Sequence, residues 1–154
     1  MAEKDDDERM RLRLRLVRSF AENVPHNHAL GIEILDMQPS EAVFRLPYDE
    51  KLVGNPDTGV VHGGVITALL DGASGAAVFA ALPMPVPIAT LDLRIDYLRP
   101  ADAHRPILAH ATCYKLTKNV AFTRAVAYHD NADDPIAHSV GTFMVSTKAG
   151  SRKP

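Results

Sequence analysis

The segment VVHGGVITALLDGASGAAVFAALPMPVPIATL spans residues 60–91, and its only ionisable side chains are those of His62 and Asp71. Residues 65–80 are rich in alanine and apolar almost all round, which is typical of a helix enclosed by other elements. Pro83 ends this helix, because proline interrupts the backbone hydrogen bonds. The segment therefore predicts one long buried helix.

Small residues form a stripe along this helix. Gly72 and Gly75 each cost roughly 1 kcal/mol relative to alanine in a helix interior, so their presence calls for a packing reason. Together with Ala68, Ala76 and Phe79 they recur at helical spacing. We expect another backbone to approach the helix closely along this stripe.

Strand patterns lie on both sides of the helix. Apolar and polar residues alternate from Leu91 to Tyr97, which predicts a strand with one face on a core. Two short strands hinged at Pro39-Ser40 are expected within residues 30–46, and three more runs rich in β-forming residues occupy 106–116, 120–129 and 135–147. The predicted fold is an α+β domain in which a meandering antiparallel sheet wraps around one buried helix.

Composition limits the classes of function. The 154 residues are 46% hydrophobic, which is sufficient for one domain with its own core, and the net charge of -2 gives no basic surface for nucleic acid. The single cysteine, Cys113, excludes an intramolecular disulfide framework and favours a reducing compartment, so a cytoplasmic location is expected. The acidic start MAEKDDDERM argues against a secretory signal, and three prolines within residues 83–87 argue against a membrane span.

Two features near the N-terminus have an alternative interpretation. Arg11, Arg13, Arg15 and Arg18 alternate with leucines and could form a basic arm that docks on anionic lipid or nucleotide. A solvated, loosely packed helix is the preferred interpretation. His26 and His28 could ligate zinc, but no further ligands follow at suitable spacing, so this pair is interpreted as part of a loop and no metal site is predicted.

The helix start and Asp71 carry the candidate chemistry. An isolated carboxylate in an apolar segment is costly unless it is neutralised, partnered or used in a reaction. His62-Gly63-Gly64 precedes the helix, so backbone N–H groups of its first turn are available to an anion or a polarised carbonyl oxygen. We expect Asp71 to be catalytic and the helix start to be a candidate oxyanion hole.

The spacing of these groups bears on the quaternary structure. Asp71 follows His62 by nine residues, which on a helix is about 13 Å along the axis and about half a turn around it. Either the two groups are unrelated, or a two-fold dimer brings the helix start of one subunit to the middle of its partner's helix. The second alternative predicts an obligate oligomer with two equivalent sites.

Three strings carry a resemblance to a known family. They are GNPDTGVVHGGVITALLDGASGAAV at residues 54–78, ATLDLRIDYLRPA at 89–101 and AHSVGTFMV at 137–145. They resemble the hotdog-fold acyl-CoA thioesterases of the PaaI-like, phenylacetate-pathway type, over roughly residues 27–147. An N-terminal arm with a short helix (1–26) and a disordered tail (148–154) are expected to flank this domain.

The resemblance implies a hotdog fold and hydrolysis of acyl-CoA thioesters without a metal or other cofactor, because coenzyme A is part of the substrate. It further implies dimers with a continuous sheet, commonly paired into homotetramers. The alternative is a non-catalytic acyl-CoA sensor or a scaffold with the same fold. The acyl group, whether aryl, medium-chain or long-chain, stays open.

The resemblance also assigns roles to individual residues. Asp71 corresponds to the general base or nucleophile, and Thr90 to a hydroxyl that positions the attacking water. The Gly63 N–H is expected to polarise the thioester carbonyl. His62 and Asn55 are expected to be supporting polar groups, and Gly64 a substrate-binding residue. In the family the helix-start groups come from one subunit and the acid and hydroxyl from the other, which agrees with the spacing of His62 and Asp71.

Overall fold

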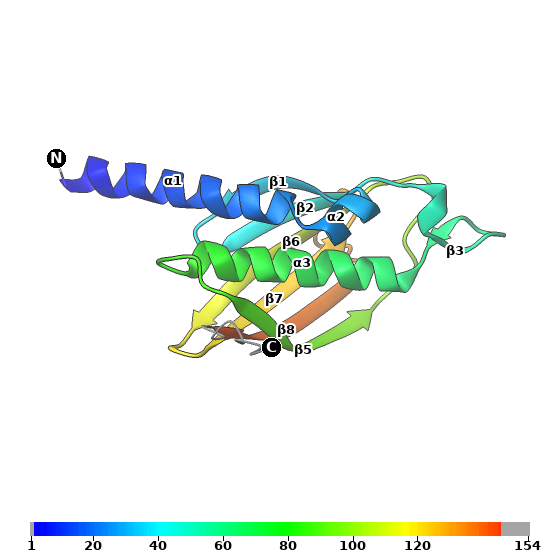
Figure 1. The fold of residues 1–154 in the computed structure, drawn as a ribbon. Helices are drawn as coiled ribbons and strands as arrows, with labels where there is room; N and C mark the ends of the chain where they lie inside the picture. Colours follow the sequence, from blue (N-terminus) through cyan, green and yellow to red (C-terminus); the bar gives the residue numbers. More distant parts are fainter. Residues whose placement is uncertain (1, 146–154) are drawn as a thin grey trace, which may run out of the picture.

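The computed structural model describes residues 2–145 of the chain. Six strands form one antiparallel sheet in the order β1-β2-β6-β7-β8-β5, and helix α3 lies across one face of it (Figure 1). The helices are α1 (Ala2–Glu22), α2 (Pro25–Leu30) and α3 (Gly63–Ala81). The strands are β1 (Glu33–Gln38), β2 (Glu41–Leu46), β3 (Val53–Asn55), β4 (Val60–Val61), β5 (Ile88–Tyr97), β6 (Ile107–Leu116), β7 (Val120–Tyr128) and β8 (Ala137–Val145).

Helix α3 confirms the buried helix that the sequence predicts. It packs mainly on β2, β6 and β7, and Leu69, Leu70 and Ala73 on this side are fully buried. Each of the two leucines contributes about 1.5–3 kcal/mol of burial free energy. By length and composition α3 could also span a membrane, but half of it is buried inside the fold, and the core helix of a water-soluble protein gives the same pattern.

The order of the strands differs in part from the predicted meander. β6, β7 and β8 follow one another along the chain and in the sheet. β5 precedes them in the chain but pairs with β8 at the far edge, while β2 pairs with β6. Helix α3 therefore carries the chain across one face of the sheet, from the side of β1 and β2 to the opposite edge, where β5 lies. The chain then returns to β6, so the predicted simple meander is wrong for β5.

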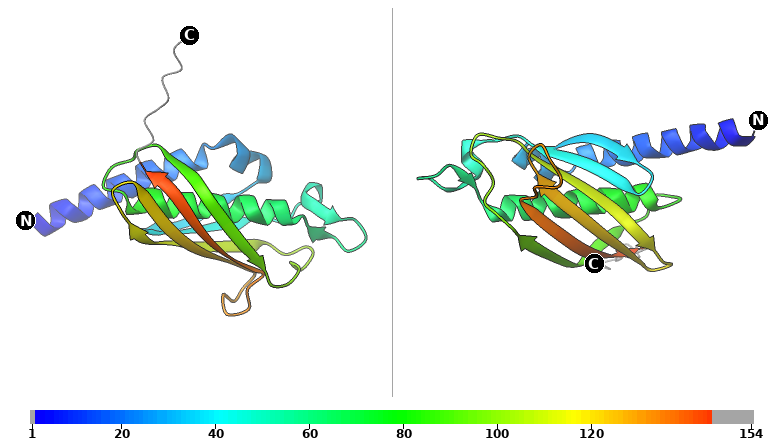
Figure 2. Two further views of the ribbon diagram at one scale, coloured as in Figure 1. Left: turned by 90° about the horizontal axis from the view of Figure 1, so that it is seen from below. Right: turned by 180° about the vertical axis from the view of Figure 1, so that it is seen from behind.

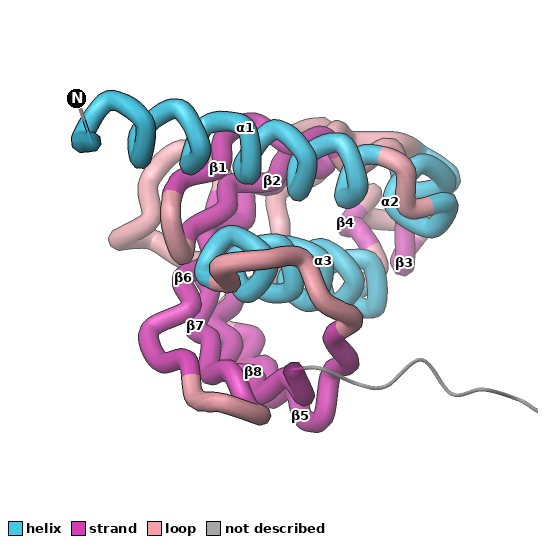
Figure 3. Tube along the Cα trace, turned by 60° about the vertical axis from the view of Figure 1, so that its left-hand side comes forward, coloured by secondary structure: helices cyan, strands magenta, loops and turns pink. Residues whose placement is uncertain are grey.

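The prediction that β5 buries one face is also only partly correct. Leu93 and Ile95 are half-buried, but Leu91 is 53% exposed and Tyr97 is 49% exposed. The physical reason is position, because β5 forms the edge of the sheet beyond the strands that α3 mainly covers (Figure 3). An alternating pattern indicates one apolar face, but it does not say whether the same chain covers that face.

Helix α1 is longer and better packed at its C-terminal end than the sequence suggested. It lies on the same side of the sheet as α3, and its N-terminal part extends beyond the strands (Figure 2). Val17 and Ala21 join the core, and the Arg18 guanidinium donates a 2.7 Å hydrogen bond to the carbonyl of Ile34 in β1. The loosely packed interpretation is therefore wrong for this end of α1. The domain division at residues 26 and 27 stays a prediction, and the tail at 148–154 lies outside the described residues.

The segment with His26 and His28 is the short helix α2, which corrects its interpretation as a loop. Pro25 is the first helical residue, where its missing N–H costs nothing. Gly31 follows the helix with a φ of 72°, and its N–H bonds the carbonyls of Asn27 and His28. Proline at the start of a helix and glycine just after its end are common signals, so α2 could have been predicted from the sequence.

Candidate active site

Helix α3 and the start of β5 bring one carboxylate and one hydroxyl together. Asp71 lies in the third turn of α3, and Thr90 Oγ1 donates a hydrogen bond of 3.0 Å to its Oδ1 atom. Asp71 is half-buried and partnered, rather than buried and alone as the sequence suggested. The pairing of β5 with β8 shifts register between Thr90 and Asp92, and such a bulge re-aims the side chains of a strand.

Asp71 and Thr90 line a cavity of about 300 Å³, which we call the reaction cavity. The small-residue stripe of α3 forms one wall of it. A Cβ atom at Gly72 would lie 3.5 Å from the ring of Phe44, and one at Gly75 would lie 3.7 Å from the ring of Phe143. The expected close approach of another backbone is therefore wrong, since the neighbours are side chains and the stripe leaves room for a ligand.

Asn27 is a polar residue of this cavity that the sequence reasoning missed. Its side chain is buried, and its Nδ2 atom donates a 3.3 Å hydrogen bond to the carbonyl of Ala21. Its Oδ1 atom lies 3.7 Å from the position that a Cβ atom on Gly72 would take. Recognition of α2 from its proline and glycine would have placed Asn27 on a helix, although not against α3.

The start of α3 is arranged around His62. This residue is the N-cap, and its Nδ1 atom accepts a 2.9 Å hydrogen bond from the N–H of Gly64. The N–H of Gly64 is therefore engaged within the chain, and the substrate-binding role of Gly64 stays a prediction. The Gly63 N–H has no hydrogen-bond partner among residues 2–145, while the Gly63 carbonyl accepts from the Tyr97 hydroxyl at 2.7 Å. One free donor at a helix start is what an oxyanion hole requires.

Asn55 lies in the hairpin of β3 and β4, beside the start of α3 (Figure 1). Its side-chain oxygen accepts a 3.0 Å hydrogen bond from the N–H of Asp57, and its carbonyl accepts from the N–H groups of Thr58 and Gly59. These bonds hold a tight turn. Asn55 is exposed as a residue, and no hydrogen bond of its amide nitrogen to residues 2–145 is found, so this nitrogen is available as a donor.

Gly54 is required for the position of this hairpin against the helix start. A Cβ atom at Gly54 would lie 2.8 Å from the Cα atom of His62, which is too close for any real contact. We expect Gly54→Ala to destabilise the protein by about 1–3 kcal/mol, as overpacking does, measured by chemical denaturation. Gly75→Ala is the matched control, because its Cβ atom meets only ordinary contacts and alanine favours the helix. Equal stability of the two variants would contradict the required close approach.

Within one chain the two halves of the predicted site stay apart. The reaction cavity is lined by Asp71 and Thr90, but not by Asn55, His62 or Gly63. Eight residues separate Gly63 from Asp71 on a continuous helix, which is about 12 Å along its axis. A single substrate carbonyl therefore cannot contact the helix start and the carboxylate of the same subunit.

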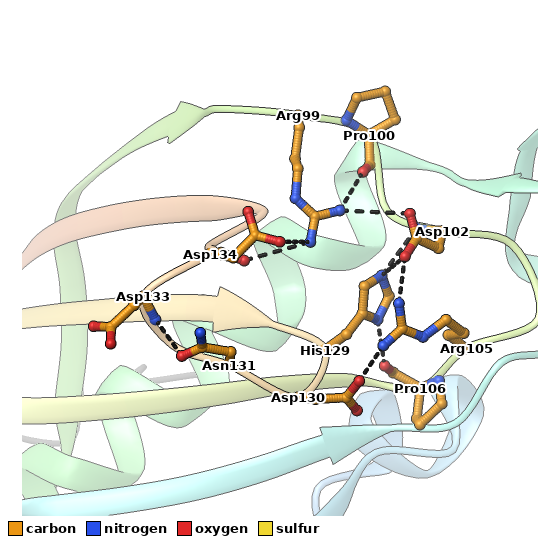
Figure 4. Close-up of polar contacts among 10 residues, drawn as sticks. All are labelled: Arg99, Pro100, Asp102, Arg105, Pro106, His129, Asp130, Asn131, Asp133 and Asp134. Carbon is orange, nitrogen blue, oxygen red and sulfur yellow. Dashed lines mark hydrogen bonds and ion pairs between the residues drawn. The ribbon is translucent and has the colours of Figure 1, made fainter.

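A second polar cluster lies at the end of the sheet near the loop after β5 (Figure 4). His129 is buried there, with Nδ1 placed 2.7 Å from the carbonyl of Pro106 and Nε2 accepting a 2.9 Å hydrogen bond from the N–H of Asp102. Arg105 pairs with Asp102 and with Asp130. Both ring nitrogens and the charges are thus engaged within the protein, and the cluster anchors the loop between β5 and β6.

Other candidate chemistry finds no support in the structure. Cys113 is buried, and this burial raises the pKa of its thiol, so it is a packed core residue rather than a nucleophile. Among the side chains that the structure describes, no group of three or more His, Cys, Asp or Glu residues is arranged to hold a metal ion.

Comparison with known proteins identifies the family. The family model of the thioesterase superfamily matches residues 58–135, the part of the chain that contains α3, β5, β6 and β7. The chain belongs to the thioesterase superfamily. The predicted hotdog-type fold and the prediction of an enzyme that hydrolyses thioesters are therefore confirmed at the level of the family.

Individual relatives agree with this assignment. The chain is 32% identical over 139 residues to the medium/long-chain acyl-CoA thioesterase YigI of Escherichia coli, covering 82% of this chain and 88% of that protein. A crystal structure of a Pseudomonas aeruginosa protein is 44% identical, with a TM-score of 0.77 over 85% of this chain and 97% of the other. The phenylacetic acid degradation protein PaaI of Thermus thermophilus, solved as a mutant, is 28% identical, with a TM-score of 0.70 over 79% and 99% of the two chains. The predicted PaaI-like resemblance is confirmed.

Proposed function

We propose that this thioesterase hydrolyses acyl-CoA to a free carboxylic acid and coenzyme A. The observation that carries the proposal is the hydrogen-bonded pair of Asp71 and Thr90 on the wall of a cavity whose remaining lining is largely apolar. The name of the YigI relative, an acyl-CoA thioesterase, supports the choice of coenzyme A as the thiol.

In the proposed reaction Asp71 acts on water. The carboxylate accepts a proton as the water oxygen attacks the thioester carbonyl carbon, and the Thr90 hydroxyl fixes the carboxylate while it does so. The Gly63 N–H stabilises the negative charge that develops on the carbonyl oxygen. The carbon–sulfur bond then breaks, coenzyme A leaves as a thiolate, and a proton returns to it from Asp71 or solvent. Direct nucleophilic attack by Asp71 is the alternative course.

We propose further that each site is shared between two subunits. The Gly63 N–H lies too far along α3 from Asp71 to serve the same carbonyl, so the donor would be that of Gly63 of the partner subunit. The free edge of β5, with exposed Leu91 and Tyr97, supports this arrangement, because a second β5 could extend the sheet across a two-fold axis. A dimer or a dimer of dimers in the cytoplasm, with no cofactor, completes the proposal.

The experiment that tests the function is release of free thiol from a panel of aryl-, short-, medium- and long-chain acyl-CoAs. Turnover of one class with saturation kinetics is the expected result. Saturable acyl-CoA binding without thiol release would instead indicate the alternative function, a non-catalytic acyl-CoA sensor. Absence of both binding and release would favour a scaffold.

Thr90 offers a sharper test of the pair. Thr90→Val keeps the shape of the side chain but removes the hydroxyl, so the carboxylate loses one fixed partner. A hydrogen bond to a charged group is worth at least about 1.5 kcal/mol, which corresponds to a fall in kcat of about tenfold. Thr90→Ser retains a hydroxyl and is expected to recover most of the rate. If the valine and serine variants have equal kcat values, the hydroxyl has no part in the reaction.

A further inference from the structure

An apolar chamber lies beside the reaction cavity. It has a volume of about 700 Å³, is open to solvent on one side, and is lined by the C-terminal half of α1, the end of α3 and the proline-rich connector that leads to β5. Leu16, Val17 and Phe79 line it together with residues 85–88, and every one of these residues is apolar. The chamber therefore suits a hydrocarbon rather than a polar ligand.

The chamber continues the reaction cavity. Phe79 and Ile88 line both spaces, so the two share a wall on α3 and a wall on β5. Along α3, Asp71, Gly75 and Phe79 follow at intervals of four residues and thus lie on one face of the helix. Gly75 has no side chain to block this face. Along this face, Asp71 lies about 12 Å from Phe79, the length of eight helical residues.

We propose that this chamber holds the distal end of a medium- or long-chain acyl group, and that α1 thereby sets the chain-length preference of the enzyme. This inference rests on the proposed acyl-CoA hydrolysis. An extended chain advances about 1.2 Å per bond, as an extended backbone does, so about ten bonds are needed to pass from Asp71 to Phe79. Acyl groups of four to six carbons stay in the reaction cavity, whereas those of twelve or more enter the chamber.

The exposure of the chamber's lining supports an apolar occupant. Leu16 is 58% exposed, and Val86 is only half-buried, although both are large apolar residues beside exposed prolines of the connector. Contiguous exposed apolar surface of this kind marks a binding site for another apolar group. Each methylene of an acyl chain that enters strengthens binding by about fourfold.

The test is to fill the chamber from α1. Leu16→Trp is expected to lower the ratio of kcat/KM for dodecanoyl-CoA to that for butanoyl-CoA by at least about tenfold, because several methylenes lose their contacts. Leu12→Trp is the matched control, since Leu12 is one turn earlier on α1, is also exposed, and does not line the chamber. Its ratio is expected to stay within about twofold of wild type. Val86→Trp fills the chamber from the connector and is expected to act like Leu16→Trp.

A binding measurement separates this inference from the proposed function. In an Asp71→Asn background, calorimetry is expected to show tighter binding of dodecanoyl-CoA than of butanoyl-CoA, and Leu16→Trp is expected to remove this difference. The role of the chamber would be overturned if the ratio of kcat/KM for dodecanoyl-CoA to that for butanoyl-CoA were unchanged in both Leu16→Trp and Val86→Trp, with the fold intact by circular dichroism. This result would leave acyl-CoA hydrolysis in place. Failure of wild type to release thiol from any acyl-CoA would instead reject the proposed function, and equal binding of the two chain lengths would then reject the chamber as well.

Discussion

Replacement of Asp71 by asparagine is expected to lower kcat for acyl-CoA hydrolysis by at least about 100-fold, the lower bound for loss of a general acid or base. Asparagine keeps the size of the side chain and can still accept the hydrogen bond from Thr90, so the fold and the reaction cavity should persist. The amide cannot accept a proton from water at neutral pH. The measurement is thiol release at saturating acyl-CoA, with the melting temperature recorded for each protein.

Asp36→Asn is the control for this change. Asp36 is an exposed carboxylate on β1, far in the sheet order from β5, and it bonds only the nearby Gln38 side chain. Its replacement is expected to leave kcat unchanged. If Asp71→Asn retained wild-type kcat, the carboxylate would be a structural partner of Thr90, and the base would have to be sought elsewhere.

Replacement of Gly63 by proline is expected to lower kcat by about 100- to 1000-fold, as loss of one oxyanion-hole donor does. Gly63 is the first residue of α3, the helical position at which proline is best tolerated. His62 before it has φ -61° and ψ 133°, an extended conformation that a following proline requires. A Cβ atom at Gly63 would meet the Tyr97 hydroxyl at 3.5 Å, an ordinary contact. Proline therefore removes the N–H with little change to the fold.

Gly63→Ala is the matched control, because it adds the same Cβ atom but keeps the N–H. The alanine variant is expected to retain most of the wild-type rate, whereas the proline variant is expected to lose it. Comparable kcat values for the two variants, with equal melting temperatures, would show that the Gly63 N–H is not the donor.

The sequence was most informative where local chemistry is decisive. The apolar, alanine-rich run predicted α3 with nearly correct ends, because Pro83 and the His62-Gly63-Gly64 string are strong stop and start signals. Asp71 stood out for its charge in an apolar segment. The spacing of His62 and Asp71, nine residues along a helix, predicted that the two residues of one chain do not share a site. In the structure, Asp71 lines the reaction cavity and His62 does not.

The features that sequence reasoning missed depend on tertiary placement. The small-residue stripe on α3 indicated close packing, but whether it meets a backbone or lines a cavity depends on where Phe44 and Phe143 lie. The alternation in β5 could not reveal that this strand is an edge. Asn27 lies 44 residues before Asp71 in the chain, and only the packing of α2 on α3 brings it to the same cavity.

The central claim is that each active site combines Asp71 of one subunit with the Gly63 N–H of the other, and a complementation assay tests it most directly. Asp71→Asn and Gly63→Pro chains are each expected to be inactive, and they would be co-expressed in equal amounts. Random pairing makes half of the dimers mixed, and one of the two sites in each mixed dimer is intact, so about a quarter of the wild-type activity should return. A co-expressed mixture that remains as inactive as the single variants, although mixed dimers are recovered from it, would contradict the shared site.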